Sequence, residues 1–316
     1  MTSRPNLDIT VAVPTAARPE PLRRLLAALP LALQGIPVAE VLVVDNAPQH
    51  PADVGDAAVR VVVEPVPGAS AARNTALREA TTPWIAFLDD DVVPEPGWLA
   101  ALVAPVRTDP EVKAVGGRVV LDPSVPRPRW FDEVGIGGYV TAFDLDRPAG
   151  PVREGEYVVT ANVLFHVPTL LAVGGFDEAL GPRPGAQIVA DDVHVVRELQ
   201  RAGHEVRWQP DAVVVHDFPD GRRDPRWLLR RAYLQGRSDW LLDADLFASR
   251  RAGGARVALS WLATELGRRR REDLRRPATA FHALTDVART AGAVREALGL
   301  ARGRRSDHRR APSRPA

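Results

Sequence analysis

Three consecutive aspartates, Asp89, Asp90 and Asp91, directly follow the apolar segment "WIAFL", which has the character of a buried strand. Carboxylates a few ångströms apart repel one another, so these three must face water, take up protons or hold a cation between them. Mg²⁺ and Mn²⁺ prefer carboxylate oxygens, and Mn²⁺ also accepts imidazole. The trio is therefore either a metal site or a set of solvated turn carboxylates.

Two further features place ionisable side chains at the ends of expected elements. Asp191 and Asp192 open a helical segment, where acidic residues favour the helix dipole and can also exchange protons with a bound group. His216 ends the strand-like run "AVVVH". A lone histidine is either a metal ligand or a packed, hydrogen-bonded residue.

The elements that must position these residues alternate along the first 90 residues. Strand patterns cover 9–13, 41–45, 59–63 and 84–89, and helical patterns cover 21–29 and 70–80. Ser70 is the predicted N-cap of the second helix. This alternation predicts a Rossmann-like α/β layer, whose ligands lie beyond the carboxyl ends of the strands. The aspartate trio lies at such an end.

The remainder of the chain is less regular and then helical. Further strands are expected at 114–121, 157–165 and 212–216, and a helix at 191–203. The segments 122–155 and 174–190 are rich in proline, glycine and charge, as functional loops often are. Beyond residue 221 two amphipathic helices are expected, surrounded by arginines.

The composition indicates a folded protein without disulfide bonds. The chain has 316 residues, of which 45% are hydrophobic, so it can bury a core, and it has no cysteine, which excludes disulfides and thiolate metal sites. Residues 1–220 carry 18 basic and 30 acidic residues, a net charge of −12, whereas residues 221–316 carry 23 and 10, a net charge of +13. The chain therefore has two electrostatic halves.

Six motifs occur in a fixed order over about residues 8–240. They are "VAVPTAARPEPLRRLLAAL", "VLVVDNAP", "PGASAARNTAL", "FLDDDVVPEPGWL", "ANVLFHVPTLLAVGGFDEALG" and "DDVHVVRELQRAGHEVRWQPDAVVVH". Together they resemble the family 2 glycosyltransferases, which use nucleotide sugars and have the GT-A fold. The resemblance implies an α/β fold with a mostly parallel central sheet and helices on both faces, followed by a helical, arginine-rich extension.

The resemblance also implies a division of the chain. Residues 1–220 form the GT-A domain, with a nucleotide-binding half at 1–97 and an acceptor half at 98–220. Residues 221–300 form the helical extension, and 301–316 a disordered basic tail.

Site residues follow from the same resemblance. Asp89 and Asp91 form the DxD motif that binds Mn²⁺ or Mg²⁺, and His216 is a further metal ligand. The residues implied in binding the donor nucleotide are Pro14, Thr15, Arg18, Asp45, Arg73, Asp89 and Asp90. For Arg73 the alternative is a structural ion pair. For Thr15 the alternative is a role at the entry of the first helix, and for Arg18 it is a charge that faces solvent.

The acid pair implies the chemistry of transfer. An acceptor hydroxyl must lose its proton as it attacks the anomeric carbon, and a carboxylate on the far side from the leaving group can take that proton. Asp192 is assigned as this general base and Asp191 as a supporting residue, with the reverse order left open, because Asp191 stands where the family usually has glutamate. Asn162 and Asp177 lie where the family builds its acceptor face.

The implied function is inverting transfer of a sugar from a nucleoside-diphosphate sugar to an acceptor hydroxyl, in bacterial cell-envelope, polysaccharide or glycolipid synthesis. One alternative is a metal-dependent nucleotidyltransferase, but "VPTAARPEP" lacks the glycine and lysine expected of its phosphate loop. The other is an inactive nucleotide-sugar-binding or scaffold protein.

The expected partners are a nucleotide-sugar donor, a saccharide or lipid-linked acceptor, and an anionic membrane surface contacted through 221–310. No nucleic-acid partner is expected. The start of the chain has no signal-peptide pattern, so we expect a cytoplasmic protein, peripheral on the inner face of the plasma membrane.

Overall fold

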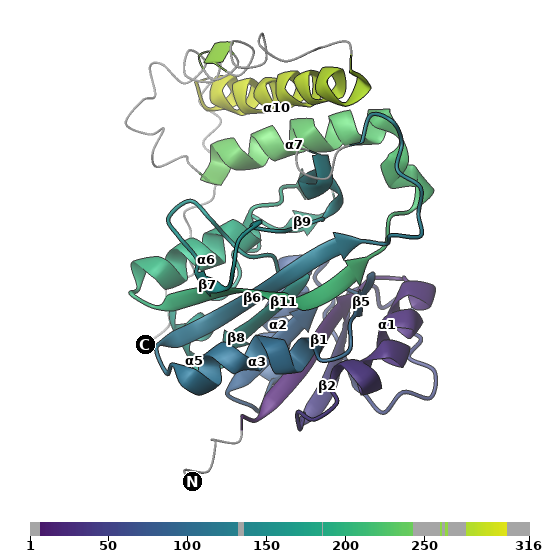
Figure 1. Cartoon of the computed structure of the whole chain (residues 1–316), viewed down its shortest axis with the longest axis vertical. Coiled ribbons are helices and arrows are strands. Elements are labelled where there is room, and N and C mark those ends of the chain that lie inside the picture. Colours follow the sequence, from purple (N-terminus) through teal and green to yellow (C-terminus); the bar gives the residue numbers. More distant parts are fainter. Residues whose placement is uncertain are drawn as a thin grey trace. The chain divides into compact units, whose positions relative to one another are not determined.

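A computed structural model of the chain describes residues 7–131, 136–184, 186–242, 260, 263–264 and 276–301 (Figure 1). The chain divides into two compact units. The first comprises Met1–Pro126, Val140–Gln187 and Asp191–Pro219, and the second comprises Arg127–Tyr139, Ile188–Ala190 and Asp220–Ala316. The longest segment of the second unit begins at Asp220, and two shorter segments from within 1–220 also belong to it. The domain division drawn from the sequence stays a prediction.

The first unit is built on one mixed sheet. Its strands are β1 (Ile9–Thr15), β2 (Glu40–Asp45), β3 (Arg60–Val63), β4 (Trp84–Leu88), β5 (Val92–Pro94), β6 (Val112–Leu121), β7 (Gly150–Pro151), β8 (Asn162–His166) and β11 (Glu205–His216). They lie in the order β3-β2-β1-β4-β8-β6-β11-β5, with β7 beside β11. Within the described residues, β3, β2, β1, β4, β6 and β11 run in one direction and only β8, β5 and β7 run in the other. The expected mostly parallel sheet is confirmed.

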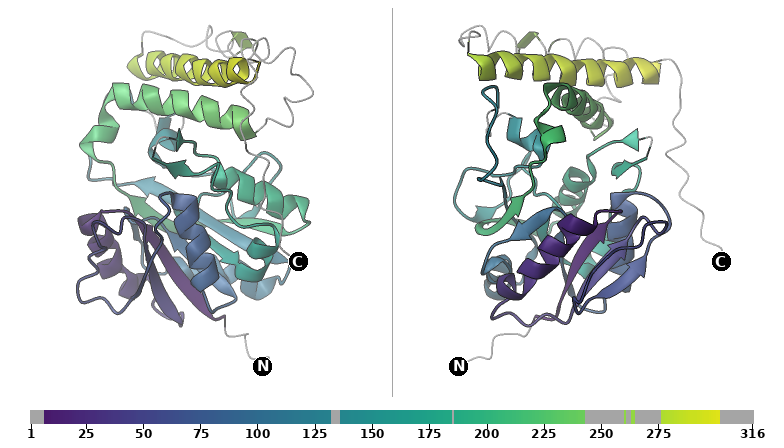
Figure 2. Two further views of the ribbon diagram at one scale, coloured as in Figure 1. Left: turned by 180° about the vertical axis from the view of Figure 1, so that it is seen from behind. Right: turned by 90° about the vertical axis from the view of Figure 1, so that its right-hand side faces the viewer.

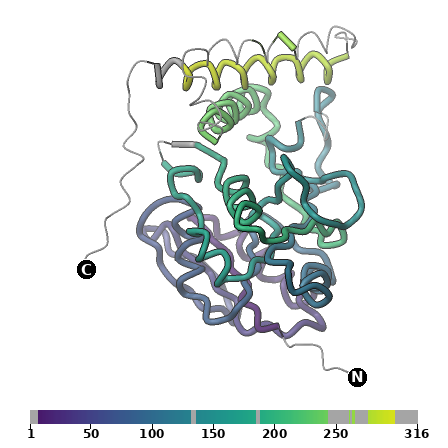
Figure 3. Tube along the Cα trace, turned by 90° about the vertical axis from the view of Figure 1, so that its left-hand side faces the viewer, coloured from purple at the N-terminus to yellow at the C-terminus, as the bar shows by residue number. Residues whose placement is uncertain are grey.

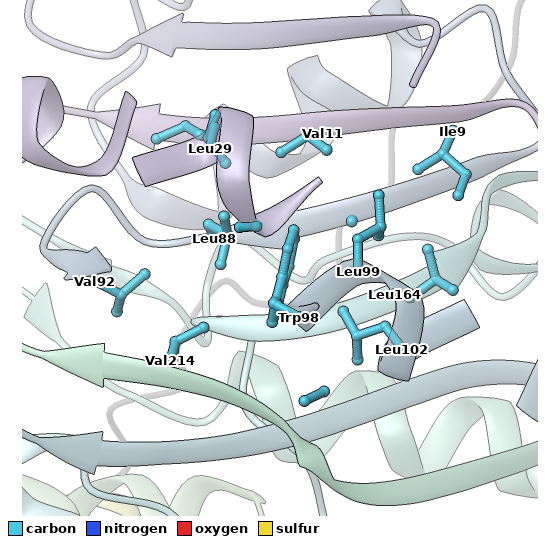
Figure 4. Close-up of a cluster of buried hydrophobic side chains, with 14 of the residues drawn as sticks. Ile9, Val11, Leu29, Leu88, Val92, Trp98, Leu99, Leu102, Leu164 and Val214 are labelled. Atoms are coloured by element: carbon cyan, nitrogen blue, oxygen red, sulfur yellow. The ribbon is translucent and has the colours of Figure 1, made fainter. Parts of the chain in front are cut away.

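Helices cover both faces of this sheet (Figures 1 and 2). α1 (Pro19–Ala32) and α3 (Trp98–Thr108) pack on one face, and α2 (Ala69–Glu79), α5 (Val167–Ala172) and α6 (Asp191–Arg201) pack on the other. Alternate residues of β1 enter the two cores, because successive strand side chains point to opposite faces. Figure 4 shows Trp98, Leu99 and Leu102 of α3 among side chains of the central strands.

The start of α2 differs from the expectation. Gly68, with φ of 149°, is the N-cap, and no side chain caps the helix, so the prediction of Ser70 as N-cap was wrong. Ser70 lies inside the first turn, where its hydroxyl donates to Asp191. A short hairpin of β9 (Pro182–Arg183) and β10 (Ala186–Gln187) lies in the loop expected at 174–190.

The second unit contains the expected helix pair, α7 (Pro225–Leu242) and α10 (Pro277–Ala301), which lie side by side (Figure 3). A Cβ added at Gly236 would lie 1.7 Å from the carbonyl oxygen of Arg289, and one added at Gly292 would lie 1.9 Å from that of Tyr233. The two glycines therefore permit the close approach of the helices. Of the two short 3-10 helices, η2 (Asp220–Arg223) lies in this unit, and η1 (Gly137–Val140) ends at Val140, which belongs to the first unit.

No helix within the described residues is long and apolar enough to cross a membrane. Ala301 ends α10, and the rest of the expected disordered tail lies outside the described residues.

Candidate functional site

The aspartate trio lies between β4 and β5, at the carboxyl end of a central strand. β5 pairs antiparallel with β11, with Val92 opposite His216, and the backbone N–H of Asp217 donates to the carbonyl oxygen of Asp91 at 3.0 Å. This pairing brings the imidazole Nε2 of His216 to 3.2 Å from Oδ1 of Asp91. The sheet thus joins two residues that were predicted as metal ligands and lie 125 positions apart in the chain (216 − 91).

The loop after β1 supplies partners for Asp90 and Asp91. Arg18 spans the two carboxylates, with Nη1 2.6 Å from Oδ1 of Asp90 and Nη2 2.7 Å from Oδ2 of Asp91. The Thr15 hydroxyl donates to the other oxygen of Asp90 at 2.7 Å. Ala17, just before Arg18, has a φ of 53°, a left-handed conformation that is uncommon for alanine. The loop backbone is therefore constrained where it presents Arg18 to the trio.

The three carboxylates have different environments. The side chain of Asp89 is 29% exposed, whereas those of Asp90 and Asp91 are 5% and 4% exposed. Burial raises the pKa of Asp90 to about 6, although Arg18 and Thr15 act in the opposite direction. The repulsion within the trio is thus relieved in part by water at Asp89, by arginines, and by the tendency of Asp90 to hold a proton.

Arg73 connects the trio to the acid pair. Its guanidinium donates from Nη2 to Asp89 at 3.0 Å and from Nη1 to Asp191 at 2.9 Å, and it lies 5.8 Å from the ring centroid of Phe176. Ser70 donates to the same Asp191 oxygen at 2.8 Å. The Arg73 side chain is buried and forms both ion pairs. The structural ion pair that the sequence analysis gave as an alternative role for Arg73 is therefore present.

Asp192 has a different environment from Asp191. Its Oδ1 is buried and has no hydrogen-bond partner among the described residues. Burial and the neighbouring charge of Asp191 raise the pKa of Asp192 to about 7, against the influence of Arg73 and of a hydrogen bond with Thr160. A carboxylate with one unpaired oxygen and a pKa near neutrality suits proton transfer.

Two residues that support this arrangement were missed by sequence reasoning. A Cβ added at Gly181 would lie 1.9 Å from the Ser70 hydroxyl, so only glycine leaves room for the contact between Ser70 and Asp191. The Asn74 side chain donates to the carbonyl oxygen of Phe176 and accepts from its N–H, both at 2.9 Å. Both lie in the quoted motifs, Asn74 directly after Arg73 in "AARN" and Gly181 at the end of "GGFDEALG", so the signal was available although neither residue was singled out.

Asp45 ends β2, as expected, but its carboxylate is already engaged. Its two oxygens accept the backbone N–H groups of Ala47 at 2.9 Å and Ala52 at 3.0 Å, and the residue is buried. Asp45 therefore orders the loop after β2. Pro14 lies within β1, opposite Val44 of β2. The nucleotide contacts of both residues stay predictions.

The two acceptor-side residues are placed very differently. Asn162 is 0% exposed, accepts from Nε1 of Trp98 at 2.7 Å, and donates to the carbonyl oxygens of Arg118 at 2.8 Å and Ala212 at 2.7 Å. The amide thus holds β6, β11 and α3 together, and its acceptor contact stays a prediction. Asp177 is exposed and caps a turn by accepting the N–H of Ala179, so its acceptor role stays a prediction.

The residues around Asp91 fit a divalent cation whose coordination a substrate completes. Within the described ranges, no three histidine, aspartate or glutamate side chains form a ready-made metal cluster. Asp91 and His216 nevertheless supply a carboxylate and an imidazole side by side. Mg²⁺ sites commonly use one or two carboxylates plus substrate phosphates, and Mn²⁺ also accepts imidazole.

Comparison with known proteins agrees with this geometry. Residues 10–161 match the family described as glycosyl transferase family 2. The chain is 31% identical over 237 residues to the pre-mycofactocin glycosyltransferase of Mycobacterium tuberculosis, a match that covers 72% of this chain and 46% of that protein. It is 28% identical over 177 residues to the glucosyl-dolichyl phosphate glucuronosyltransferase of Haloferax volcanii, covering 56% of each. The chain thus spans about half the length of these curated relatives.

Among solved structures, the fold is similar to that of a mannosyltransferase from Pyrobaculum calidifontis in complex with GDP-Man and Mn²⁺. The TM-score is 0.52 at 24% sequence identity, and the match covers 96% of this chain and 77% of that one. The motifs, the matched domain and the fold lead to one conclusion: residues 10–161 form a glycosyl transferase family 2 domain, and the chain has the GT-A fold.

Proposed function

We propose that this protein transfers a sugar from a nucleoside-diphosphate sugar to an acceptor hydroxyl, with inversion, in a single displacement. The observation that carries the proposal is the state of Asp192, whose unpaired buried oxygen and raised pKa suit a general base. Asp191 and Arg73 connect this residue to Asp89 of the aspartate trio. A base on one side and an acidic donor site on the other are what a single displacement requires.

In this mechanism Asp192 accepts the proton of the acceptor hydroxyl at its unpaired Oδ1. Asp191 accepts hydrogen bonds from Ser70 and Arg73 and holds the start of α6 in place. Thr15 and Arg18, which contact Asp90, bind the donor nucleotide. No separate nucleophile is needed, since the hydroxyl itself attacks the anomeric carbon.

Asp91, His216 and Asp89 would hold a divalent cation, Mn²⁺ or Mg²⁺. When bound, such a cation stabilises the charge that develops on the leaving diphosphate. The mannosyltransferase of similar fold was solved with GDP-Man and Mn²⁺, which supports a nucleotide-sugar donor and a cation in this protein too.

The acceptor class we propose is a saccharide or lipid-linked sugar of the bacterial cell envelope. The relative named for glucosyl-dolichyl phosphate supports a lipid-linked acceptor, and the net charge of +13 in residues 221–316 supports contact with an anionic membrane surface from the cytoplasmic side.

A thermal-shift screen tests the donor site. UDP, GDP and dTDP sugars are added with and without Mn²⁺ to the wild type, to Asp91→Asn and to the control Asp53→Asn, whose carboxylate pairs with Arg23 at the surface. We expect one nucleotide to raise the melting temperature only with the cation, in the wild type and the control but not in Asp91→Asn. The absence of any cation-dependent shift in the wild type would refute the donor site and favour an inactive scaffold.

Mass spectrometry of sugar release or transfer with the stabilising donor then tests the chemistry. We expect Asp192→Asn to bind the donor normally and to lose transfer by about 10²–10⁴-fold, the range for removal of a general base. Unchanged transfer in Asp192→Asn would refute its role as the base.

A further inference from the structure

Asp191 and Asp192 are adjacent acids in the first turn of α6, yet they have opposite surroundings. One oxygen of Asp191 accepts both Ser70 and Arg73, from the first two turns of α2. Asp192 has an oxygen with no partner. Ser70 and Arg73 therefore offset the negative charge of Asp191, whereas Asp192 is left free to exchange a proton.

The packing that produces this difference is tight. Gly181 lies against the Ser70 hydroxyl and has no space for a side chain, and Arg73 lies beside the ring of Phe176. The second nitrogen of Arg73 donates to Asp89, so the guanidinium cannot turn towards Asp192 without breaking an ion pair. Arg73 is held in place from both ends.

We propose that Arg73 is a positioning residue for Asp192: it neutralises Asp191, ties the start of α6 to the donor-side Asp89, and thereby sets the charge that Asp192 experiences. The inference rests on the proposed function only for the role of Asp192 as the base. The charged groups that act on Asp192 are Asp191 on its own helix, Arg73 on α2 and Asp89 after β4, and the Thr160 hydroxyl before β8 is its hydrogen-bond partner.

The test measures protonation of Asp192 through stability, without any sugar, nucleotide or metal. Melting temperatures are recorded with and without Asp192→Asn, from about pH 4 to about pH 9. The ordinary aspartate pKa of 3.8 applies to the unfolded chain and a pKa of about 7 to the folded one. The folded state therefore holds the proton to a higher pH than the unfolded state, and ionisation of Asp192 destabilises the fold progressively as pH rises between the two pKa values. The gain in melting temperature from Asp192→Asn grows over the same range. It levels off near the folded pKa of Asp192, and this pH is the levelling-off point.

The same pair of measurements is repeated in four backgrounds. In Arg73→Gln the loss of positive charge should move the levelling-off point up, and in Asp191→Asn the loss of like charge should move it down, each by about 1 pH unit or more. Arg73→Lys keeps the charge and should stay near the wild type. Arg78→Gln, on the same helix but paired with Glu64, is the matched control and should leave the point unchanged.

A purely structural role for Arg73 would lower the melting temperature at every pH and leave the levelling-off point in place, which would overturn the proposal. If Arg73→Gln does not fold, Asp191→Asn decides alone, because an unmoved point in that background refutes the coupling. If the points move as expected while no donor sugar is transferred, the coupling stands and the proposed function fails.

Discussion

At the scale of single residues, two arginines determine the state of the acidic site. Arg18 bridges Asp90 and Asp91, and Arg73 bridges Asp89 and Asp191. Each guanidinium spans two carboxylates, a use for which its fork of donors is suited. Removing either arginine therefore changes the charge balance at two acids at once.

Arg18 is expected to compete with a divalent cation for Asp91. In the absence of donor, we expect Arg18→Gln to bind Mn²⁺ at least about tenfold more tightly than the wild type does. The reason is that the positive charge of Arg18 repels the cation, and like charges side by side cost several kcal/mol of binding free energy. Isothermal titration calorimetry measures this, with Arg23→Gln, from the surface of α1, as the control. Equal affinity in Arg18→Gln and the wild type would contradict it.

The pKa of Asp192 predicts the pH dependence of transfer. The base works when ionised, so the transfer rate should rise with pH and level off above about pH 7. Initial rates at saturating donor and acceptor give this profile. A rate that is flat between about pH 5 and pH 8 would contradict the assignment.

Sequence reasoning named both arginines and all five of these acids because they lie in the six motifs that resemble family 2 glycosyltransferases. It could not find the link between Ser70 and Asp191, which are 121 positions apart, or the space left by Gly181. It could not give the contacts of Asn162 either, because a motif gives a residue's position in the chain and not the direction of its side chain. The contacts of that amide depend on α3, β6 and β11 together.

At the scale of elements, the site depends on how the antiparallel strands are inserted into the parallel sheet. β8 separates β4 from β6, and Asn162 at its start bonds to three other elements. The alternation of strands and helices predicted the layers, whereas the position of β8 depends on pairings far apart in the chain.

Asn162 is expected to be a stability residue. Asn162→Leu removes the hydrogen bonds to the Trp98 N–H and to the carbonyl oxygens of Arg118 and Ala212, so we expect a loss of about 3 kcal/mol or more in the free energy of unfolding. Urea denaturation measures this, and the exposed change Asp177→Asn should stay within about 0.5 kcal/mol. A loss below about 1 kcal/mol in Asn162→Leu would mean that the amide network contributes little.

At the scale of the whole molecule, the charge of the chain is divided between acidic and basic segments. The first 220 residues have a net charge of −12 and the remainder +13. Within the second unit, Arg226 and Arg230 are exposed one turn apart on α7, while α7 and α10 meet at Gly236 and Gly292.

The basic segment predicts salt-sensitive binding to anionic vesicles. Reversing two charges in Arg226→Glu/Arg230→Glu should weaken vesicle binding by about tenfold or more, given about 1 kcal/mol for each basic residue near an anionic surface. Co-sedimentation with phosphatidylglycerol vesicles at low and high salt measures this. Binding that salt does not reduce would contradict an electrostatic contact.

The helix pair predicts a steric constraint. Gly292→Val places a side chain against the carbonyl of Tyr233 and should cost about 1–3 kcal/mol. Calorimetry compares it with Ala291→Val at the adjacent exposed position. There valine lowers helix propensity relative to alanine, whereas it raises it slightly relative to glycine, so a larger loss in Gly292→Val reports the steric contact. Equal effects of the two changes would mean that the helices do not meet at Gly292.

The pairing of β5 with β11 has a consequence for how this chain can evolve. Only three residues of β5 hold Asp91 beside His216, and a shift of one residue in a strand turns each side chain to the opposite face. Lineages of this protein should therefore accept insertions and deletions in the long segment 122–155 but keep a constant number of residues between Asp91 and Trp98. We expect the length at that place to be as constant as the aspartates themselves.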